Sequence, residues 1–155
     1  MRRVINEKRI NNCPTQSSPA PKINQLVRIA IVRSDFDDKA VRDFTALINP
    51  KIIKFEGVIT KDFEGCLSVP DVYGLVPRHT KIRVKAIDID GNEIRFKANG
   101  FLSRIIQHEV DHVNGTVFID HIRDEKDAFF KLDEEGELQP LDYDKYIKNN
   151  EVLWS

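Results

Sequence analysis

The chain has 155 residues, 41% of them hydrophobic, and a formal net charge of −1. These values fit one globular domain of ordinary size. Because acidic and basic residues are mixed, the composition gives no signal for a nucleic-acid or membrane-surface partner. No apolar run is long enough to cross a bilayer. The two cysteines, Cys13 and Cys66, are too few for a disulfide framework and favour a reducing compartment.

The amino-terminal residues bear on location. Met1 to Arg9 are basic, but they include Glu7 and lead into no apolar segment. A secretory signal is therefore not expected, and we predict a cytoplasmic protein. A mitochondrial transit segment, which would be rich in Arg and Ser and poor in acidic residues, is the less favoured alternative.

Strand signals dominate the first half of the chain. Residues 1–25 are rich in Asn, Ser and Pro without a period, which predicts a loop or weakly ordered arm. A polar turn is predicted at residues 35–39. Runs of apolar and β-branched residues predict strands at 26–32, 44–49 and 52–55, the last two separated by Asn49-Pro50. Pro70 excludes the segment 64–70 from a central strand.

The second half begins with a hairpin signature. Residues 81–87 and 93–98 alternate apolar and charged residues on either side of Asp90-Gly91. Further along the chain we predict these elements: a helix at 100–114, a short strand at 117–119, a helix at 124–132, a turn at 135–137 and a helix at 143–149. Strands followed by a packed helix predict an α+β fold, with small mixed or antiparallel sheets packed around a central helix.

The central helix carries the pattern H-E-x-x-H. His108 and His112 are four residues apart, so their imidazoles project from one helix face and can bind one metal ion. Glu109 lies beside the first of them, within reach of a water on that ion. Phe101 and Ile105 continue the stripe of the two histidines along the helix. Just beyond it, Asn114-Gly115 supplies a helix stop.

Two histidines leave a metal site short of a ligand, since catalytic sites of the zinc type usually have three protein ligands. A third histidine, as in the metzincins, would stand at position 118, which holds Phe118. Glu134 or Glu135 would complete a thermolysin-like set, but both lie in a charged tract. Cys66 is the remaining candidate, although a lone cysteine is more often a small buried side chain.

Two motifs together resemble a known family. Glu64-Gly65-Cys66-Leu67-Ser68 and the segment 107–112 are similar to the second and third motifs of the peptide deformylases. Shorter similarities are Ile48-Asn49-Pro50, Leu75-Val76-Pro77-Arg78 and Asn99-Gly100-Phe101-Leu102. The resemblance predicts a catalytic domain at residues 26–120, preceded by a divergent arm at 1–25 and followed by an extension at 121–155, expected to be helical.

The resemblance implies a metal-dependent hydrolase, a metallo-amidase, that removes the formyl group from the N-terminal methionine of nascent polypeptides. Its implied partners are formylated nascent peptides and the ribosome exit region. The implied metal ligands are Cys66, His108 and His112. The implied native ion is iron(II), and zinc, nickel or cobalt can occupy the same site.

Roles for the other motif residues follow from the same resemblance. Glu109 would act as general base, and the backbone N–H of Leu67, with a glutamine of the first motif, would donate to the oxyanion. Gln107 and Asp111 are interpreted as orienting Cys66 and a histidine ring. Glu64 and Arg78 are expected to form an ion pair, with a solvated arginine as the alternative. Gly65, Phe101 and Ile105 are expected to contact the substrate. For Phe101 and Ile105 the alternative is ordinary core packing.

The first family motif, G-x-G-x-A-A-x-Q, is altered here. Its counterpart is the segment 15–22, which lacks both glycines and has Lys22 in place of the glutamine. Losing one oxyanion donor typically slows an enzyme by about 100- to 1,000-fold. In the family a long helix precedes this motif, and the residues before position 15 are too few to form it. We therefore expect a divergent or truncated arm. Two hypotheses stay open: an active deformylase, or a deformylase-like metal- and peptide-binding protein with little activity. An endopeptidase is disfavoured because the third histidine is missing.

Overall fold

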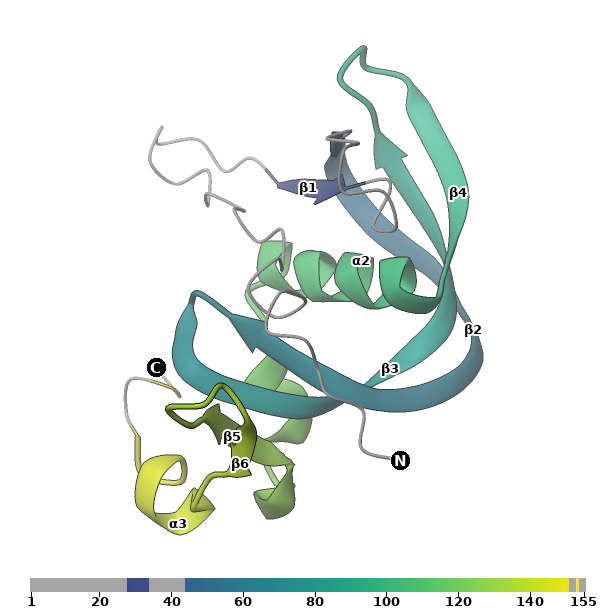
Figure 1. Ribbon diagram of the computed structural model, residues 1–155. Helices are drawn as coiled ribbons and strands as arrows, with labels where there is room; N and C mark the ends of the chain where they lie inside the picture. Colours follow the sequence, from purple (N-terminus) through teal and green to yellow (C-terminus); the bar gives the residue numbers. More distant parts are fainter. Residues whose placement is uncertain (1–27, 34–43, 151–152, 154–155) are drawn as a thin grey trace. The chain divides into compact units, whose positions relative to one another are not determined.

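The computed structural model describes residues 28–33, 44–150 and 153. The predicted arm at 1–25 and the polar turn at 35–39 lie outside the described residues. The elements in chain order (Figure 1) are β1 (Ile29–Arg33), β2 (Phe44–Cys66), β3 (Val69–Ile87), β4 (Glu93–Asn99), α2 (Gly100–Val113), the 3₁₀ helices η2 (Phe118–Ile122) and η3 (Lys126–Ala128), β5 (Phe129–Leu132), β6 (Leu138–Pro140) and α3 (Tyr143–Tyr146). The mixture of antiparallel strands with helices confirms the predicted α+β class.

The strands form one hydrogen-bonded order, β1-β2-β3-β5-β6, and β4 also pairs with β3. The chain divides into two compact units. One, called the helix unit here, comprises residues 14–60 and 78–117; the other, called the C-terminal unit, comprises residues 1–13, 61–77 and 118–155. The long strands β2 and β3 therefore contribute to both units. Among the helices of the described residues, none combines the length and apolarity needed to span a bilayer.

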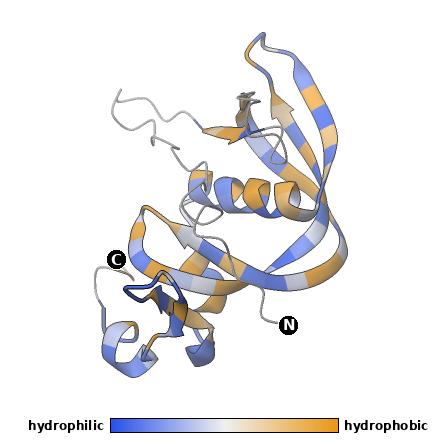
Figure 2. Ribbon diagram, viewed as in Figure 1, coloured by the Kyte–Doolittle hydropathy of each residue, from blue (hydrophilic) through white to orange (hydrophobic). Residues whose placement is uncertain are grey.

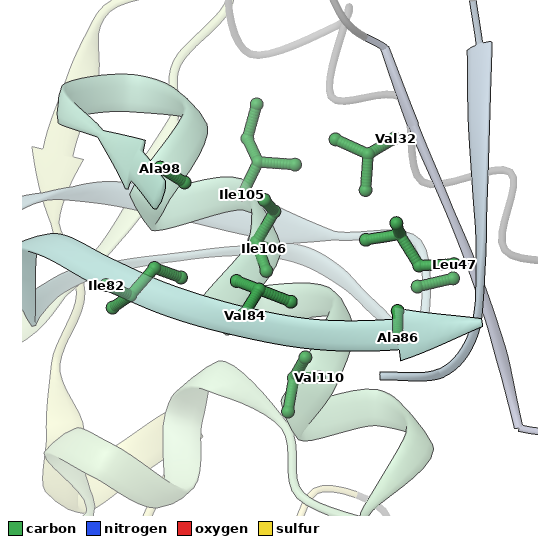
Figure 3. Close-up of a cluster of buried hydrophobic side chains, with 10 residues drawn as sticks. Val32, Leu47, Ile82, Val84, Ala86, Ala98, Ile105, Ile106 and Val110 are labelled. Atoms are coloured by element: carbon green, nitrogen blue, oxygen red, sulfur yellow. The ribbon is translucent and has the colours of Figure 1, made fainter. Parts of the chain in front are cut away.

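The core of the helix unit forms where α2 packs against β1 and β4. In β1, buried Ala30 and Val32 alternate with exposed Ile29 and Ile31, as expected for a strand with one face on the core. The buried cluster, most of it shown in Figure 3, consists of Ala30, Val32, Leu47, Ile82, Val84, Ala86, Ala98, Ile105, Ile106 and Val110. Each large aliphatic side chain buried here contributes about 1.5–3 kcal/mol, so this cluster is what fixes α2 in place.

Helix α2 ends where the sequence predicts. Gly115 has φ +79°, a left-handed conformation that costs glycine little. Its N–H donates to the His112 carbonyl at 3.0 Å, and the Thr116 N–H donates to the Asp111 carbonyl at 2.9 Å. These bonds satisfy carbonyls that the last helical turn leaves open. The hairpin is also confirmed, since β3 pairs with β4 from Lys81↔Asn99 to Ile87↔Glu93.

The predicted break at Asn49-Pro50 is wrong. Residues 44–49 and 52–55 belong to one continuous strand, β2. Asn49 adopts φ +51° and its N–H donates to the Arg28 carbonyl at 2.7 Å, so the chain passes through the dipeptide without leaving the sheet. Asparagine tolerates this left-handed conformation better than most residues. Pro70, which was expected to bar its segment from a central strand position, is the second residue of β3, near a strand end, where a missing N–H is tolerated.

The C-terminal unit differs most from expectation. The predicted strand at 117–119 is replaced by η2, and the predicted helix at 124–132 is replaced by η3 and β5. β5 pairs with β3 at Tyr73↔Phe130, and β6, which the sequence did not indicate, pairs with β5. The described residues of the predicted extension, 121–150 and 153, are therefore not mainly helical. Of the predicted helix at 143–149, only Tyr143–Tyr146 forms.

The turn at residues 135–137 is confirmed and joins β5 to β6. The Asp133 carboxylate accepts the N–H groups of Glu135 at 3.1 Å and Glu137 at 2.8 Å. These hydrogen bonds hold the pKa of Asp133 below its usual range, with the Glu137 N–H as the largest cause. Gly136 takes φ +81° between them. A local Asp–Gly turn of this kind is readable from sequence.

Gly74 allows η2 to approach β3. A Cβ at Gly74 would lie 2.6 Å from Ile122 Cδ1 and 2.8 Å from the Phe118 ring, and both of those side chains are fully buried. A Gly→Ala change in a strand without strain would be neutral or stabilising. Here we expect Gly74→Ala to lower the free energy of unfolding by about 1–3 kcal/mol through overpacking.

Urea unfolding of Gly74→Ala measures that loss. Ile122→Val removes the nearer methyl group, so the cost of the alanine should be smaller in an Ile122→Val background than in the natural chain. Equal stability of Gly74→Ala and the natural chain would contradict the close packing described here.

Candidate metal centre

The two motif histidines face each other on α2. Their Nε2 atoms lie 3.0 Å apart and the rings stand at 85°. A tetrahedral ion with metal–nitrogen bonds of about 2.0–2.1 Å separates two ligand atoms by about 3.3–3.4 Å. The observed spacing is close to that value. His108 is buried and His112 is half-buried, so the pair converges at the edge of the helix unit as the four-residue spacing predicts.

Glu109 is buried in the same turn of α2, with 1% of its surface exposed. A buried carboxylate is costly to keep in a fold that needs only packing. Glu109 follows His108 directly in the sequence, and its carboxylate is shielded from bulk water. This arrangement suits general acid–base chemistry at a metal.

Gln107 connects α2 to β3. Its Nε2 donates to the His79 carbonyl at 2.9 Å and to the Ser103 carbonyl and hydroxyl at 3.0 Å each, while its Oε1 accepts the His79 N–H at 3.2 Å. The Ser103 hydroxyl donates to the same His79 carbonyl at 2.8 Å. These hydrogen bonds hold the helix that carries the histidines, and the orienting role expected of Gln107 toward Cys66 or a histidine ring stays a prediction.

Asp111 pairs with Arg78 from β3. The Arg78 Nη1 donates to Asp111 Oδ2 at 2.5 Å, and the Arg78 side chain is 4% exposed. A charge-assisted bond to a buried guanidinium fixes the helical turn that ends in His112. The sequence did not predict this pair. Glu64, the partner considered for Arg78, is buried in the C-terminal unit, and its pairing with Arg78 stays a prediction.

Cys66 ends β2 and stands before the two-residue turn formed by Leu67 and Ser68. It is half-buried and forms no disulfide, and the Ser68 N–H lies 3.4 Å from its sulfur. A thiolate is the form of cysteine that binds metals. The Leu67 side chain is 78% exposed, which places the residue at the tip of the turn. The expected donation from its backbone N–H stays a prediction.

Gly65 is required by packing. A Cβ at this position would lie 2.7 Å from the Tyr73 ring, so a larger residue would displace the ring or the cysteine turn. Burial, and to a lesser extent Asp71, raises the pKa of Tyr73, which keeps its hydroxyl neutral. The expected contact of Gly65 with substrate stays a prediction.

The two apolar residues on the histidine stripe have different environments. Ile105 belongs to the buried cluster of the helix unit, which favours the core-packing alternative for this residue. Phe101, in the first turn of α2, is 49% exposed, so its ring is accessible to a ligand. Lys22 lies outside the described residues.

Among the described residues, the thiol of Cys66 and the imidazoles of His108 and His112 are side chains of the types that could hold a metal ion. One thiolate and two imidazoles suit zinc, iron, cobalt or nickel better than calcium or magnesium, which prefer oxygen ligands. Combined with the H-E-x-x-H helix, this donor set defines the class of mononuclear metallohydrolases.

Comparison with known proteins identifies the family. The family model described as Polypeptide deformylase matches residues 15–128. The chain is 43% identical over 123 residues to a peptide deformylase of Thermomicrobium roseum, covering 76% of this chain and 68% of the relative. It is 46% identical over 102 residues to peptide deformylase 1 of Clostridium perfringens, covering 66% of each. The chain belongs to the polypeptide deformylase family.

Solved structures agree with this assignment. A class I type b peptide deformylase of Acinetobacter baumannii with Met-Ala-Ser bound has a TM-score of 0.56 and 36% identity, covering 61% of this chain and 62% of that one. A peptide deformylase of Legionella pneumophila has a TM-score of 0.55 and 35% identity, covering 66% and 58%. The chain thus spans about two thirds of the length of the relatives it matches.

Proposed function

We propose that the chain hydrolyses the formamide of N-formylmethionyl nascent polypeptides at a divalent ion ligated by Cys66, His108 and His112. The observation that carries this proposal is the facing pair of ring nitrogens, 3.0 Å apart, in a helix that also carries the buried Glu109. Membership in the deformylase family supports it. The Acinetobacter relative binds a peptide that begins with methionine, which is the kind of product this reaction would release.

The donor set fits an ion that acts as a Lewis acid. When bound, the ion would polarise the formyl carbonyl and lower the pKa of a water in the site. We propose iron(II) as the native ion, with zinc, nickel or cobalt as replacements. Softer thiolate and imidazole ligands accept all four.

Glu109 would take a proton from the attacking water and deliver it to the leaving amine. The formyl C–N bond breaks, and formate and a free methionyl amine are the products. The backbone N–H of Leu67, in the turn after Cys66, would donate to the oxygen that becomes negative. The accessible ring of Phe101 is our candidate for contact with the methionine side chain.

The second candidate function is a metal- and peptide-binding protein with little activity. It is favoured by the altered segment 15–22, in which Lys22 replaces the second oxyanion donor. A positive side chain beside a cation is repelled, so Lys22 would not replace the amide. Under this hypothesis the ion would bind normally while turnover would be low.

Formate release from formyl-Met-Ala-Ser distinguishes the two. We expect turnover by the iron(II) form under anaerobic conditions, and a rate increase toward 100- to 1,000-fold in Lys22→Gln if one donor is missing. No formate from a fully metallated sample would overturn the proposed activity. An unchanged rate in Lys22→Gln would show that Lys22 does not occupy the donor position.

The cell context is proposed on the same basis. Formylated nascent peptides are the proposed partners, and they would be met at the ribosome exit region. The relatives reported above are bacterial proteins, which supports the cytoplasm as the location.

A further inference from the structure

The β3–β4 hairpin has one apolar face and one charged face. Ile82, Val84 and Ala86 are buried in the core of the helix unit. The residues between them point the other way, and Figure 2 shows hydrophilic and hydrophobic residues alternating along β4. The charged residues of this surface, called the basic face here, are Lys54, Glu56, Lys81, Arg83, Lys85, Glu93, Arg95 and Lys97.

The register places these residues side by side. Arg83 is paired with Lys97, and Lys85 with Arg95, and directly paired residues of antiparallel strands lie on the same side of the sheet. The Glu56 carboxylate of β2 accepts hydrogen bonds from Nε and Nη2 of Arg83, each at 3.0 Å. These bonds join β2 to the same surface. The basic face is therefore continuous across three strands.

The basic face carries six cations and two carboxylates, whereas the whole chain has a net charge of −1. Both carboxylates are already engaged by cations of the face. Hydrogen bonding to Arg83, and then to Lys54, lowers the pKa of Glu56 to about 2. Glu93 pairs with Lys85 at 2.5 Å and with Arg95 at 2.8 Å. A net charge near zero for the whole chain therefore coexists with a local excess of positive charge on this face.

Lys81 and Lys97 are the cations of the face for which the described residues provide no acidic partner. Both line an open cavity of about 380 Å³, together with Glu56, Ile82, Arg83 and Asn99. Gly57, with φ +73°, also lines this cavity, and a Cβ there would collide with the Thr80 hydroxyl. The lining of the cavity thus includes a glycine that leaves room beside Thr80 and two lysines for which the described residues provide no acidic partner.

We propose that the basic face binds the phosphodiester backbone of RNA, with Lys81 and Lys97 as the principal contacts. A row of cations spaced along strands suits a repeating anion. The hairpin strands β3 and β4 contain none of the large exposed hydrophobic side chains, so they provide no apolar anchor of the kind that a membrane surface requires. The face contains none of the proposed catalytic residues, so the proposal stands or falls separately from the proposed hydrolysis.

The test measures binding of the full chain to a fluorescently labelled single-stranded RNA by anisotropy over a range of salt concentrations. Removal of two phosphate contacts from single-stranded nucleic acid reduces the slope of log affinity against log salt by about 1.4. We expect this reduction, with weaker binding, in Lys81→Gln/Lys97→Gln. The control, Lys131→Gln/Lys148→Gln, removes the same charge from the C-terminal unit and should bind as the natural chain does.

Formate release from a free formyl peptide should be equal in both double variants, which separates loss of RNA binding from loss of the proposed activity. Three results would overturn the proposal. They are no RNA binding by the natural chain at low salt, equal effects of the two double variants, and equal competition by polyglutamate of the same charge. The last result would assign the face to acidic proteins.

Discussion

Replacing Glu109 by alanine is expected to lower formate release by about 100- to 10,000-fold, the usual contribution of a positioned general base. The metal content should not change, because the carboxylate is not among the proposed ligands. Glu109 is 1% exposed, so the substitution also leaves a small cavity. Folding must therefore be followed alongside activity, by circular dichroism and by metal analysis of the same sample.

Two controls make the Glu109 result specific. Glu135→Ala removes an exposed carboxylate from the β5–β6 turn and should leave the rate unchanged. Glu109→Gln keeps the side-chain volume but cannot accept the proton, so its rate should match that of the alanine variant. A Glu109→Gln protein that holds its metal and turns over normally would contradict the assignment of Glu109 as base.

Replacing His108 by alanine is expected to abolish both tight metal binding and formate release. Loss of a group that only orients a ligand typically costs about 10- to 100-fold in metal affinity. Loss of a ligand itself should exceed that range. Competition with a chromophoric chelator measures the affinity, and Cys66→Ser and His112→Ala should behave in the same way.

His121→Ala is the matched control for the ligand variants. His121 is exposed in η2, outside the motif, and its replacement should leave the metal affinity unchanged. If His108→Ala retained metal with the affinity of the natural chain while folded, the paired rings would not be the ligands. The proposed reaction would then lose its chemical basis.

The parts of the fold that follow from the sequence are those with local signals. The β3–β4 hairpin follows from Asp90-Gly91, where Gly91 adopts φ +87°, and the end of α2 follows from Gly115. The facing rings of His108 and His112 follow from helical spacing alone. In each case the residues that decide the structure lie within one turn of each other.

The parts that do not follow depend on distant partners. The segment 124–132 has helix-forming charged residues, but β5 forms because Phe129 and Phe130 pair with β3. The Phe130 ring also packs edge-to-face on the Phe63 ring, with the two ring centroids 4.9 Å apart. Tertiary pairing of this kind overrides local propensity.

The contacts that brace the site are also distant in sequence. Arg78 and Asp111 are 33 residues apart, and His79 and Gln107 are 28 apart. No spacing rule identifies such partners, because their meeting depends on how α2 packs across the sheet. The family motifs identified the residues themselves but assigned Gln107 a different contact.

X-ray absorption spectroscopy of the zinc-loaded chain tests the central claim most directly. We predict one sulfur near 2.3 Å and two imidazole nitrogens near 2.0–2.1 Å, the usual distances for these ligands, with the sulfur lost in Cys66→Ser. A spectrum with nitrogen and oxygen neighbours only, unchanged by Cys66→Ser, would contradict the account.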